Sequence, residues 1–110
     1  MKNQETYWQK IRHFVRDKFG LPGEVYDIVF LVGVQELGYG FQQLDQETKT
    51  KVFNFASIYL MKYMDREQRR AIQIQAKSEA EEDEQEQYLE KEIYKQAIIN
   101  YFKDKKILDS

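Results

Sequence analysis

Apolar residues recur at helical spacing along most of the chain. The pattern predicts four helices, at about residues 5–19, 24–37, 45 to at least 64, and 85–104. The first, third and last gather their apolar side chains on one face, which is typical of helices that cover a core. We therefore predict an all-α fold in which residues 1–110 form a single domain of four helices around one core.

Glycine, proline and cap residues mark the ends of these helices. Pro22, in the segment FGLPG, suits the first position of the second helix, because its missing N–H costs nothing there. Gly38 is expected to end that helix in a left-handed conformation, and Asp45 is expected to cap the N-terminus of the third. These signals set the predicted boundaries of the second and third helices.

The second predicted helix is apolar around well over half of its circumference. Such a helix is either a central core helix or a membrane span. Residues 24–37 are too few to cross a bilayer, which takes roughly 20 apolar residues, so we predict a central core helix. Gly33, in its interior, is expected to let a neighbouring helix approach closely.

Glu36 is an exception on this helix, because its carboxylate falls within the apolar arc, between Val25 and Val29. A buried carboxylate must be paired, hydrogen-bonded or protonated. In a structural interpretation it bonds the start of the third helix, a tyrosine, Trp8 or an arginine. In a functional interpretation it is an acid or a ligand contact with a raised pKa. Glu36 is therefore the candidate buried polar or ligand contact.

Residues 65–87 contain almost no large apolar residues apart from Ile72 and Ile74. This charged segment fits a helical extension or a mobile connection, and AIQIQA alternates with the period of a short strand. Of these we expect a continued helix with a break near Lys77 or Ser78.

Composition narrows the class of protein. With 42% hydrophobic and 15% aromatic residues among 110, the chain has enough core material for one folded domain. The absence of cysteine excludes disulfides, thiolate metal sites and cysteine nucleophiles. No stretch has the pattern of a signal peptide or a membrane span, which predicts a cytoplasmic protein with no membrane partner.

Charge is distributed unevenly along the chain. Residues 1–64 hold 8 basic and 7 acidic residues, whereas residues 65–110 hold 9 and 12, which agrees with the net charge of −2. An acidic chain has no general electrostatic attraction to nucleic acid or anionic membranes. A local basic patch precedes the acidic run at residues 79–92 and could pair with it. The patch comprises Lys62, Arg66, Arg69, Arg70 and Lys77.

Residues of catalytic type do not form a recognisable constellation. The segment GVQELGYG has the glycine spacing of a phosphate-binding loop, but it lacks the lysine and the serine or threonine that contact phosphate and magnesium. His13 is the single histidine, and no metal-ligand or triad partner is spaced around it. We predict no catalytic or metal-binding residues, no cofactor and no enzymatic activity.

Two apolar residues of the third predicted helix, Ile58 and Met61, project away from its core-facing stripe. A second surface is expected to cover them, because uncovered apolar groups mark contact sites. Together with Arg66, Arg69 and Arg70 they form the candidate interaction surface.

The segment IVFLVGVQELGYG resembles a stretch found in small uncharacterised bacterial proteins, in which an apolar helix similarly ends near G-V-Q-E-L-G. The likeness covers about residues 1–60. It implies a small helical bacterial protein and transfers no functional residue.

Three functions fit these features. The first, which we favour, is a small interaction or regulatory module that binds a protein partner or a second copy of itself through the candidate interaction surface. The second is a small-molecule-binding protein or enzyme with a pocket near Glu36. The aromatic candidates for that pocket are Trp8, Tyr26, Tyr39 and Tyr59. The third is nucleic-acid binding through residues 62–77, which the acidic run that follows disfavours.

Overall fold

The computed structural model describes residues 2–39, 44–77 and 84–108. Within these residues the chain forms α-helices, one 3₁₀ turn and no β-strand. The elements are α1 (Lys2–Phe19), α2 (Val25–Leu37), α3 (Gln46–Leu60), the 3₁₀ turn η1 (Met61–Tyr63), α4 (Arg66–Lys77) and α5 (Glu84–Asp104). The all-α prediction is confirmed, and the predicted count of four helices is wrong, since the described residues contain five. No helix in this part of the chain is long and apolar enough to cross a membrane.

The additional helix arises because the chain turns after α3 instead of continuing as one helix. α3 ends at Leu60, and after η1 the backbone of Met64 is extended, with φ −112° and ψ 153°. Asp65 and Gln68 then cap α4 reciprocally. The N–H of Gln68 donates to Asp65 Oδ1 at 2.8 Å, and the N–H of Asp65 donates to Gln68 Oε1 at 3.1 Å. This capping box starts a new helix, so the predicted continuation of the third helix to at least Met64 is wrong.

The described part of the charged segment 65–87 is therefore largely helical. The residues AIQIQA lie inside α4, so the strand interpretation is wrong. Ile72 points into the core and is almost fully buried. The predicted break near Lys77 or Ser78 falls where the description stops, because residues 78–83 lie outside the described residues.

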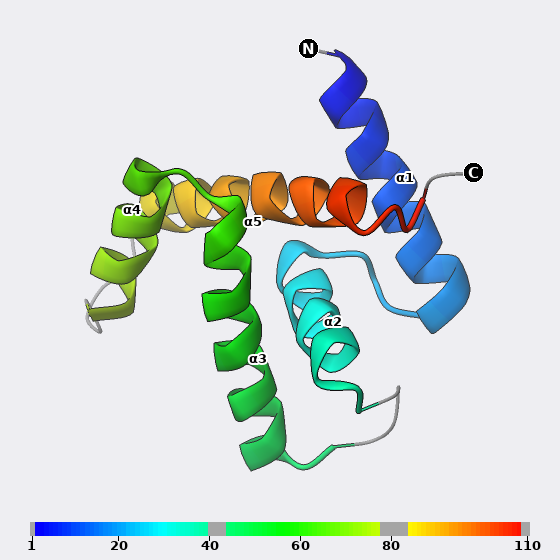
Figure 1. Ribbon diagram of the computed structural model, residues 1–110, viewed down its shortest axis with the longest axis horizontal. Coiled ribbons are helices and arrows are strands. Elements are labelled where there is room, and N and C mark those ends of the chain that lie inside the picture. Colours follow the sequence, from blue (N-terminus) through cyan, green and yellow to red (C-terminus); the bar gives the residue numbers. More distant parts are fainter. Residues whose placement is uncertain (1, 40–43, 78–83, 109–110) are drawn as a thin grey trace.

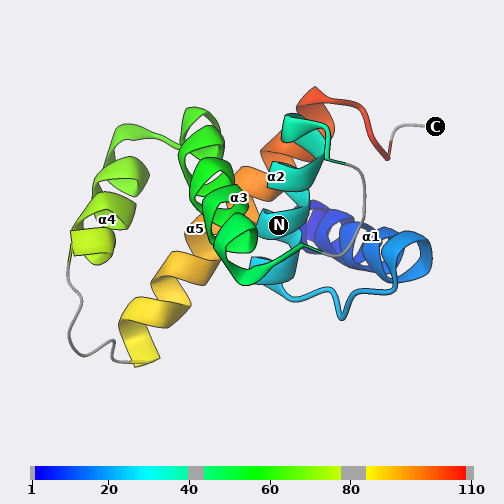
Figure 2. The same ribbon diagram turned by 90° about the horizontal axis from the view of Figure 1, so that it is seen from below.

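Helix α5 is the element against which the other helices pack. It contacts α1, α2, α3, η1 and α4. Figures 1 and 2 show α4 beside the N-terminal half of α5 and α1 beside its C-terminal half, so α1 and α4 lie at opposite ends of the molecule. The resulting shape is flat, with principal extents of 40, 39 and 23 Å. The core lies along α5, and α2 and α3 extend to one side of it (Figure 1).

Helices α2 and α3 lie side by side, and Gly33 is the reason that they approach closely. A Cβ atom at Gly33 would lie 2.7 Å from the carbonyl oxygen of Val52 and 3.0 Å from the Cβ of Ala56. The predicted role of Gly33 as a packing position is confirmed. The buried residues of α2 are Ile28, Val29, Leu31, Val32, Gly33 and Val34. α2 is thus a core helix, as its apolar circumference predicted.

The connection between α2 and α3 has both of its predicted caps. Gly38 is left-handed, with φ 74°, and its N–H lies 3.1 Å from the carbonyl of Val34. Asp45 Oδ1 accepts a hydrogen bond from the N–H of Thr48 at 2.7 Å, and this bond lowers the pKa of Asp45.

Pro22 does not occupy the first position of α2, so that prediction is wrong. The helix begins at Val25, and Gly23, with φ 84°, lies between the proline and the helix. A left-handed residue interrupts the helical path, so the helix starts after it. The Pro22 carbonyl is instead held by α1, because Arg16 Nε donates to it at 3.1 Å.

Candidate functional site

Glu36 lies in the last turn of α2, and its carboxylate is paired. The side chain is 20% exposed, so it is mostly but not fully removed from water. The Tyr101 hydroxyl on α5 donates a hydrogen bond to Glu36 Oε2 at 2.6 Å, and Lys105 Nζ lies 4.0 Å from the same oxygen. Because Tyr101 lies in the last turn of α5 and Lys105 directly follows that helix, Glu36 connects the end of α2 to the C-terminal end of α5.

Two further tyrosines surround Tyr101. The rings of Tyr59 and Tyr63 pack edge-on against the Tyr101 ring, with centroid distances of 6.0 and 5.8 Å. The Tyr63 hydroxyl donates to Asp104 Oδ2 at 2.6 Å. These residues connect α2, α3, η1 and α5 at one end of the core. We call the group the tyrosine network: Glu36, Tyr59, Tyr63, Tyr101, Asp104 and Lys105.

The network favours the protonated forms of Tyr63 and Tyr101. Burial, followed by the hydrogen bond to the Glu36 carboxylate, raises the pKa of Tyr101 above its usual value of 10.0. Burial, followed by the hydrogen bond to Asp104, raises the pKa of Tyr63. Hydrogen bonding to Tyr59 raises the pKa of Lys105, and the charge of Glu36 adds to this effect. At neutral pH the network therefore consists of donors matched to acceptors, which is an arrangement that stabilises a fold.

The four aromatic candidates for a pocket near Glu36 do not converge on it. Trp8 is buried in the core, and Tyr39 is exposed to solvent. Tyr26 is hydrogen-bonded to Glu90, which precedes Tyr101 by three helical turns. Tyr59 belongs to the tyrosine network. The geometry supports the structural interpretation of Glu36, in which a tyrosine is its partner.

The apolar residues of the candidate interaction surface line a groove between α3, α4 and α5. The groove has a volume of about 560 Å³. Its apolar lining is Ile58, Met61 and Ile72. Met61 and Ile72 also pack against the core, whereas the Ile58 side chain is 68% exposed. Ile58 is thus a large apolar residue that no described part of the chain covers.

The polar lining of the groove comprises Asn54, Ser57, Gln73, Glu90 and Tyr94, and two side-chain hydrogen bonds involve three of these residues. The hydroxyls of Ser57 and Tyr94 are hydrogen-bonded to each other, and the Tyr26 hydroxyl donates to Glu90. Burial raises the pKa of Tyr94; the bond to Ser57 opposes this shift, and the charge of Glu90 adds to it. The paired residues are 37 and 64 positions apart, so no local pattern in the sequence indicated them.

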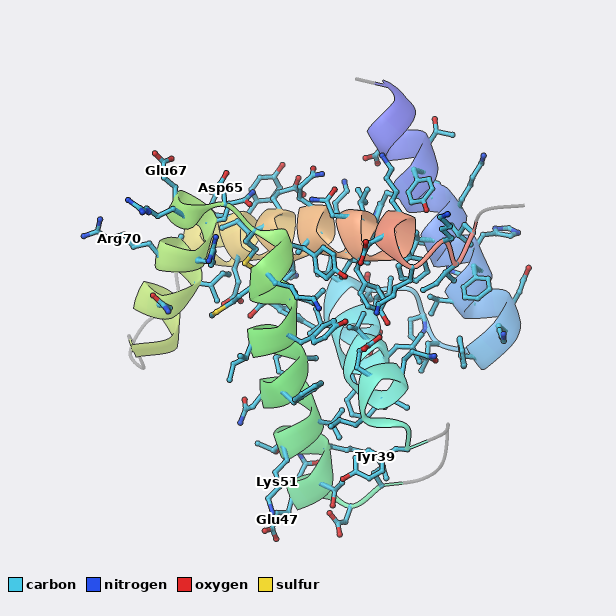
Figure 3. The ribbon with its side chains drawn as sticks, in the orientation of Figure 1. Tyr39, Glu47, Lys51, Asp65, Glu67 and Arg70 are labelled. Atoms are coloured by element: carbon cyan, nitrogen blue, oxygen red, sulfur yellow. The ribbon has the colours of Figure 1, made fainter. Side chains whose placement is uncertain are left out.

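Four exposed cations lie on and beside α4, and we call them the basic rim. They are Lys62, Arg66, Arg69 and Arg70. Figure 3 shows Arg70 pointing outward from α4, away from α3. Among the residues that the structure describes, no carboxylate lies within ion-pair distance of the three arginines. The rim therefore consists of exposed cations that no carboxylate of the described residues pairs with.

Arg69 is the member of the basic rim closest to the groove in helical position. It precedes Ile72 by three residues and Gln73 by four, and both of these line the groove. Residues at this spacing lie on one face of a helix, so Arg69 extends the groove-facing side of α4 by one turn. Positive charge thus lies one helical turn beyond the lining on α4, whereas the Glu90 carboxylate on α5 belongs to the lining itself.

The acidic run 79–92 is described only in part. Glu92 is exposed, and Glu90 is hydrogen-bonded to Tyr26 in the groove. The predicted pairing of the run with the basic patch falls on residues outside the described part of the chain, so it stays a prediction.

Residues that could bind a metal do not cluster in the described part of the chain, where no group of three or more histidines or carboxylates has suitable geometry. His13 is exposed, and its Nε2 lies 3.9 Å from Asp17 Oδ2 within the same helix. This geometry is that of a surface pair.

Comparisons with protein-family models, with curated proteins and with solved structures gave no match to this chain. The resemblance of the GVQELG stretch to small bacterial proteins stays a prediction. The function is therefore argued from the geometry of the groove and of its surroundings.

Proposed function

We propose that the protein is a helical interaction module, and that the groove between α3, α4 and α5 binds an amphipathic helix that carries acidic residues. The observation that carries this proposal is the exposure of Ile58, a residue that lines the groove and is 68% exposed to solvent. A partner that covered it would bury apolar surface at a gain of roughly 25 cal/mol per Å². Binding, and not catalysis, is the proposed activity.

The shape of the groove favours a helix as the occupant. α3 and α4 form its two sides, and α5 contributes Glu90 and Tyr94. A groove between helices suits the apolar stripe of a further helix, whose side chains recur at three- and four-residue spacing. Ile58 and the partly exposed Met61 offer the contacts that such a stripe would cover, because Ile72 is already buried.

The charge beside the groove favours an acidic partner. Arg69 is exposed one helical turn before the lining residues Ile72 and Gln73 of α4, and Arg66 and Arg70 are exposed on the same helix. Glutamates flanking the apolar stripe of a bound helix would meet these cations. Charge complementarity of this kind raises the association rate and selects the partner, and it weakens with salt.

Titration with two synthetic helical peptides tests the proposal. Both carry a leucine stripe; one has glutamate on its flanks and the other has lysine. The glutamate peptide should bind more tightly, and added salt should weaken its binding. Ile58→Glu and Arg69→Glu should each weaken it by at least about tenfold, because one removes the apolar contact and the other reverses a rim charge.

Two controls accompany these variants. Lys10→Glu reverses an exposed charge on α1, at the end of the molecule opposite α4, and should leave binding unchanged (Figure 1). Ile58→Glu should change the free energy of unfolding by less than about 0.5 kcal/mol, since the position is exposed.

Several outcomes would reject the proposed partner. Equal affinity for the two peptides, or no effect of Ile58→Glu, would exclude an acidic helix in the groove. Light scattering that shows a dimer dispersed by Ile58→Glu would assign the groove to a second copy of the chain. Salt-dependent binding to duplex DNA that is lost in Arg69→Glu would assign the basic rim to nucleic acid instead.

A further inference from the structure

A second concavity lies on the other side of the core, between α1, α2 and the C-terminal end of α5. Its volume is about 160 Å³. Ile28 and Val32 from α2 and Phe102 from α5 line it, and all three are buried. Neither the tyrosine network nor the groove explains this cleft, although Tyr101 also contributes to its lining. In Figure 1 the three helices meet at the end of the molecule opposite α4.

The size and lining of the cleft suit one aromatic ring. An engineered apolar cavity of about 150 Å³ in another protein stays dry and binds benzene, so this volume accommodates a single ring. Phe14, Phe19 and Phe102 contribute rings to the lining. Phe14 contacts the other two edge to face, at centroid distances of 6.2 Å in both cases. A bound ring would extend this arrangement, in which aromatic edges meet aromatic faces.

Lys18 is the one charged residue in the lining of the cleft as described. Its Nζ lies 5.4 Å from the centre of the Phe14 ring and 5.9 Å from that of Phe19. In the described residues no carboxylate forms an ion pair with it. Gln35, also exposed, adds an amide to the lining. The polar groups of the cleft are thus a cation and a hydrogen-bond donor.

The nearby carboxylate of Glu36 does not oppose this charge. Glu36 is not part of the lining, and its carboxylate is occupied by Tyr101 and Lys105. The tyrosine network therefore holds a negative charge away from the cleft.

We propose that this cleft binds a small aromatic carboxylate of one ring. The ring lies against Ile28, Val32 and Phe102, and the carboxylate lies at the exposed side between Lys18 and Gln35. The buried apolar lining provides the affinity for the ring, and the ammonium group selects an anion. This binding site is separate from the proposed groove, and neither proposal depends on the other.

Titration of benzoate into the protein with ¹³C-labelled methyl groups tests the site. Ile28, Leu31, Val32 and Ile107 line the cleft, so their methyl resonances should shift in a saturable way. The methyl resonances of Ile58, which lies in the groove, should not shift. Benzyl alcohol, which lacks the charge, should bind at least about tenfold more weakly, in keeping with a charge-assisted contact. The larger 2-naphthoate should also bind more weakly, because its second ring exceeds the volume of the cleft.

Lys18→Gln, with Lys51→Gln as the matched control, tests the charge. Lys18→Gln should reduce benzoate affinity to the level of benzyl alcohol in the wild type, and Lys51→Gln should leave it unchanged. Leu31→Phe places a ring in the cleft and should abolish binding; if that variant does not fold, Lys18→Gln decides. An absence of saturable shifts at the four methyl-bearing residues would overturn the proposal. Equal binding of the acid and the alcohol would overturn the assignment of an anionic ligand.

Discussion

Helix α3 meets α2 and α4 in two different ways. On the α2 side, Gly33 brings the backbones so close that a single added carbon would lie 2.7 Å from the Val52 carbonyl. On the α4 side, a groove of about 560 Å³ separates the helices, and Ile58 stays 68% exposed. One helix thus contributes both to a filled interface and to an open one.

The difference separates the interface that contributes most to the stability of the fold from the surface that the proposed partner would cover. A close interface between helices contributes dispersion and burial, and it tolerates little change in volume. An open groove contributes little to stability, and its side chains can change without unfolding the protein. The tyrosine network closes the packed side at one end, and the capping box starts the helix that forms the open side.

The largest effect is expected from Gly33→Val. The new Cβ would be too close to the Val52 backbone and to the Ala56 side chain, so the helices must separate. We expect a loss of about 2–3 kcal/mol in the free energy of unfolding, measured by chemical denaturation. Asn54→Val introduces the same side chain at an exposed helical position as a control. Equal stability of Gly33→Val and wild type would contradict the close approach of α2 and α3.

A smaller effect is expected from Tyr101→Phe, which leaves Glu36 without its hydrogen-bond donor. At pH 7 the free energy of unfolding should fall by about 1–2 kcal/mol. Because the folded state raises the pKa of Tyr101, its contribution is complete below 10.0 and is lost as pH rises above that value. Tyr101→Phe should therefore show a shallower loss of stability above pH 10.0 than the wild type.

Thermal melts from pH 7 to pH 11 measure this difference. Tyr88→Phe, at an exposed tyrosine, is the control and should follow the wild-type profile. A Tyr101→Phe profile parallel to wild type at high pH would show that the Tyr101 hydroxyl does not respond to folding. That result would contradict the claim that the tyrosine network stabilises one end of the packed side.

The smallest effect is expected from Asp65→Ala, which removes half of the capping box of α4. The substitution should destabilise α4 by about 1 kcal/mol, because the helix loses its N-terminal cap. Amide hydrogen exchange should show reduced protection in α4, with α2 and the first half of α3 unchanged. Gln73→Ala, in the same helix, is the control. Equal loss of protection in α2 would show that the two sides of α3 unfold as one unit.

Local features of the chain predicted much of the fold. The apolar circumference of residues 24–37 predicted a core helix, and Gly33, Gly38 and Asp45 predicted a close approach and two caps. The predicted helix count was wrong, although the sequence contains the signal for the fifth helix. Asp65 and Gln68 stand at the spacing of a capping box, which marks the start of α4. The predicted position of Pro22 was wrong because Gly23 adopts a left-handed conformation, which delays the start of α2 to Val25.

The sequence by itself determined which residues each helix turns toward a core, because helical spacing fixes the face of a residue. The tertiary structure alone decided which surfaces meet. Glu36 and Tyr101 are 65 positions apart, and the groove and the cleft each combine residues from three helices. A helical wheel shows that a carboxylate points inward or an isoleucine outward. Which partner lies opposite depends on how distant helices pack, and this decides that Glu36 is paired while Ile58 is left uncovered.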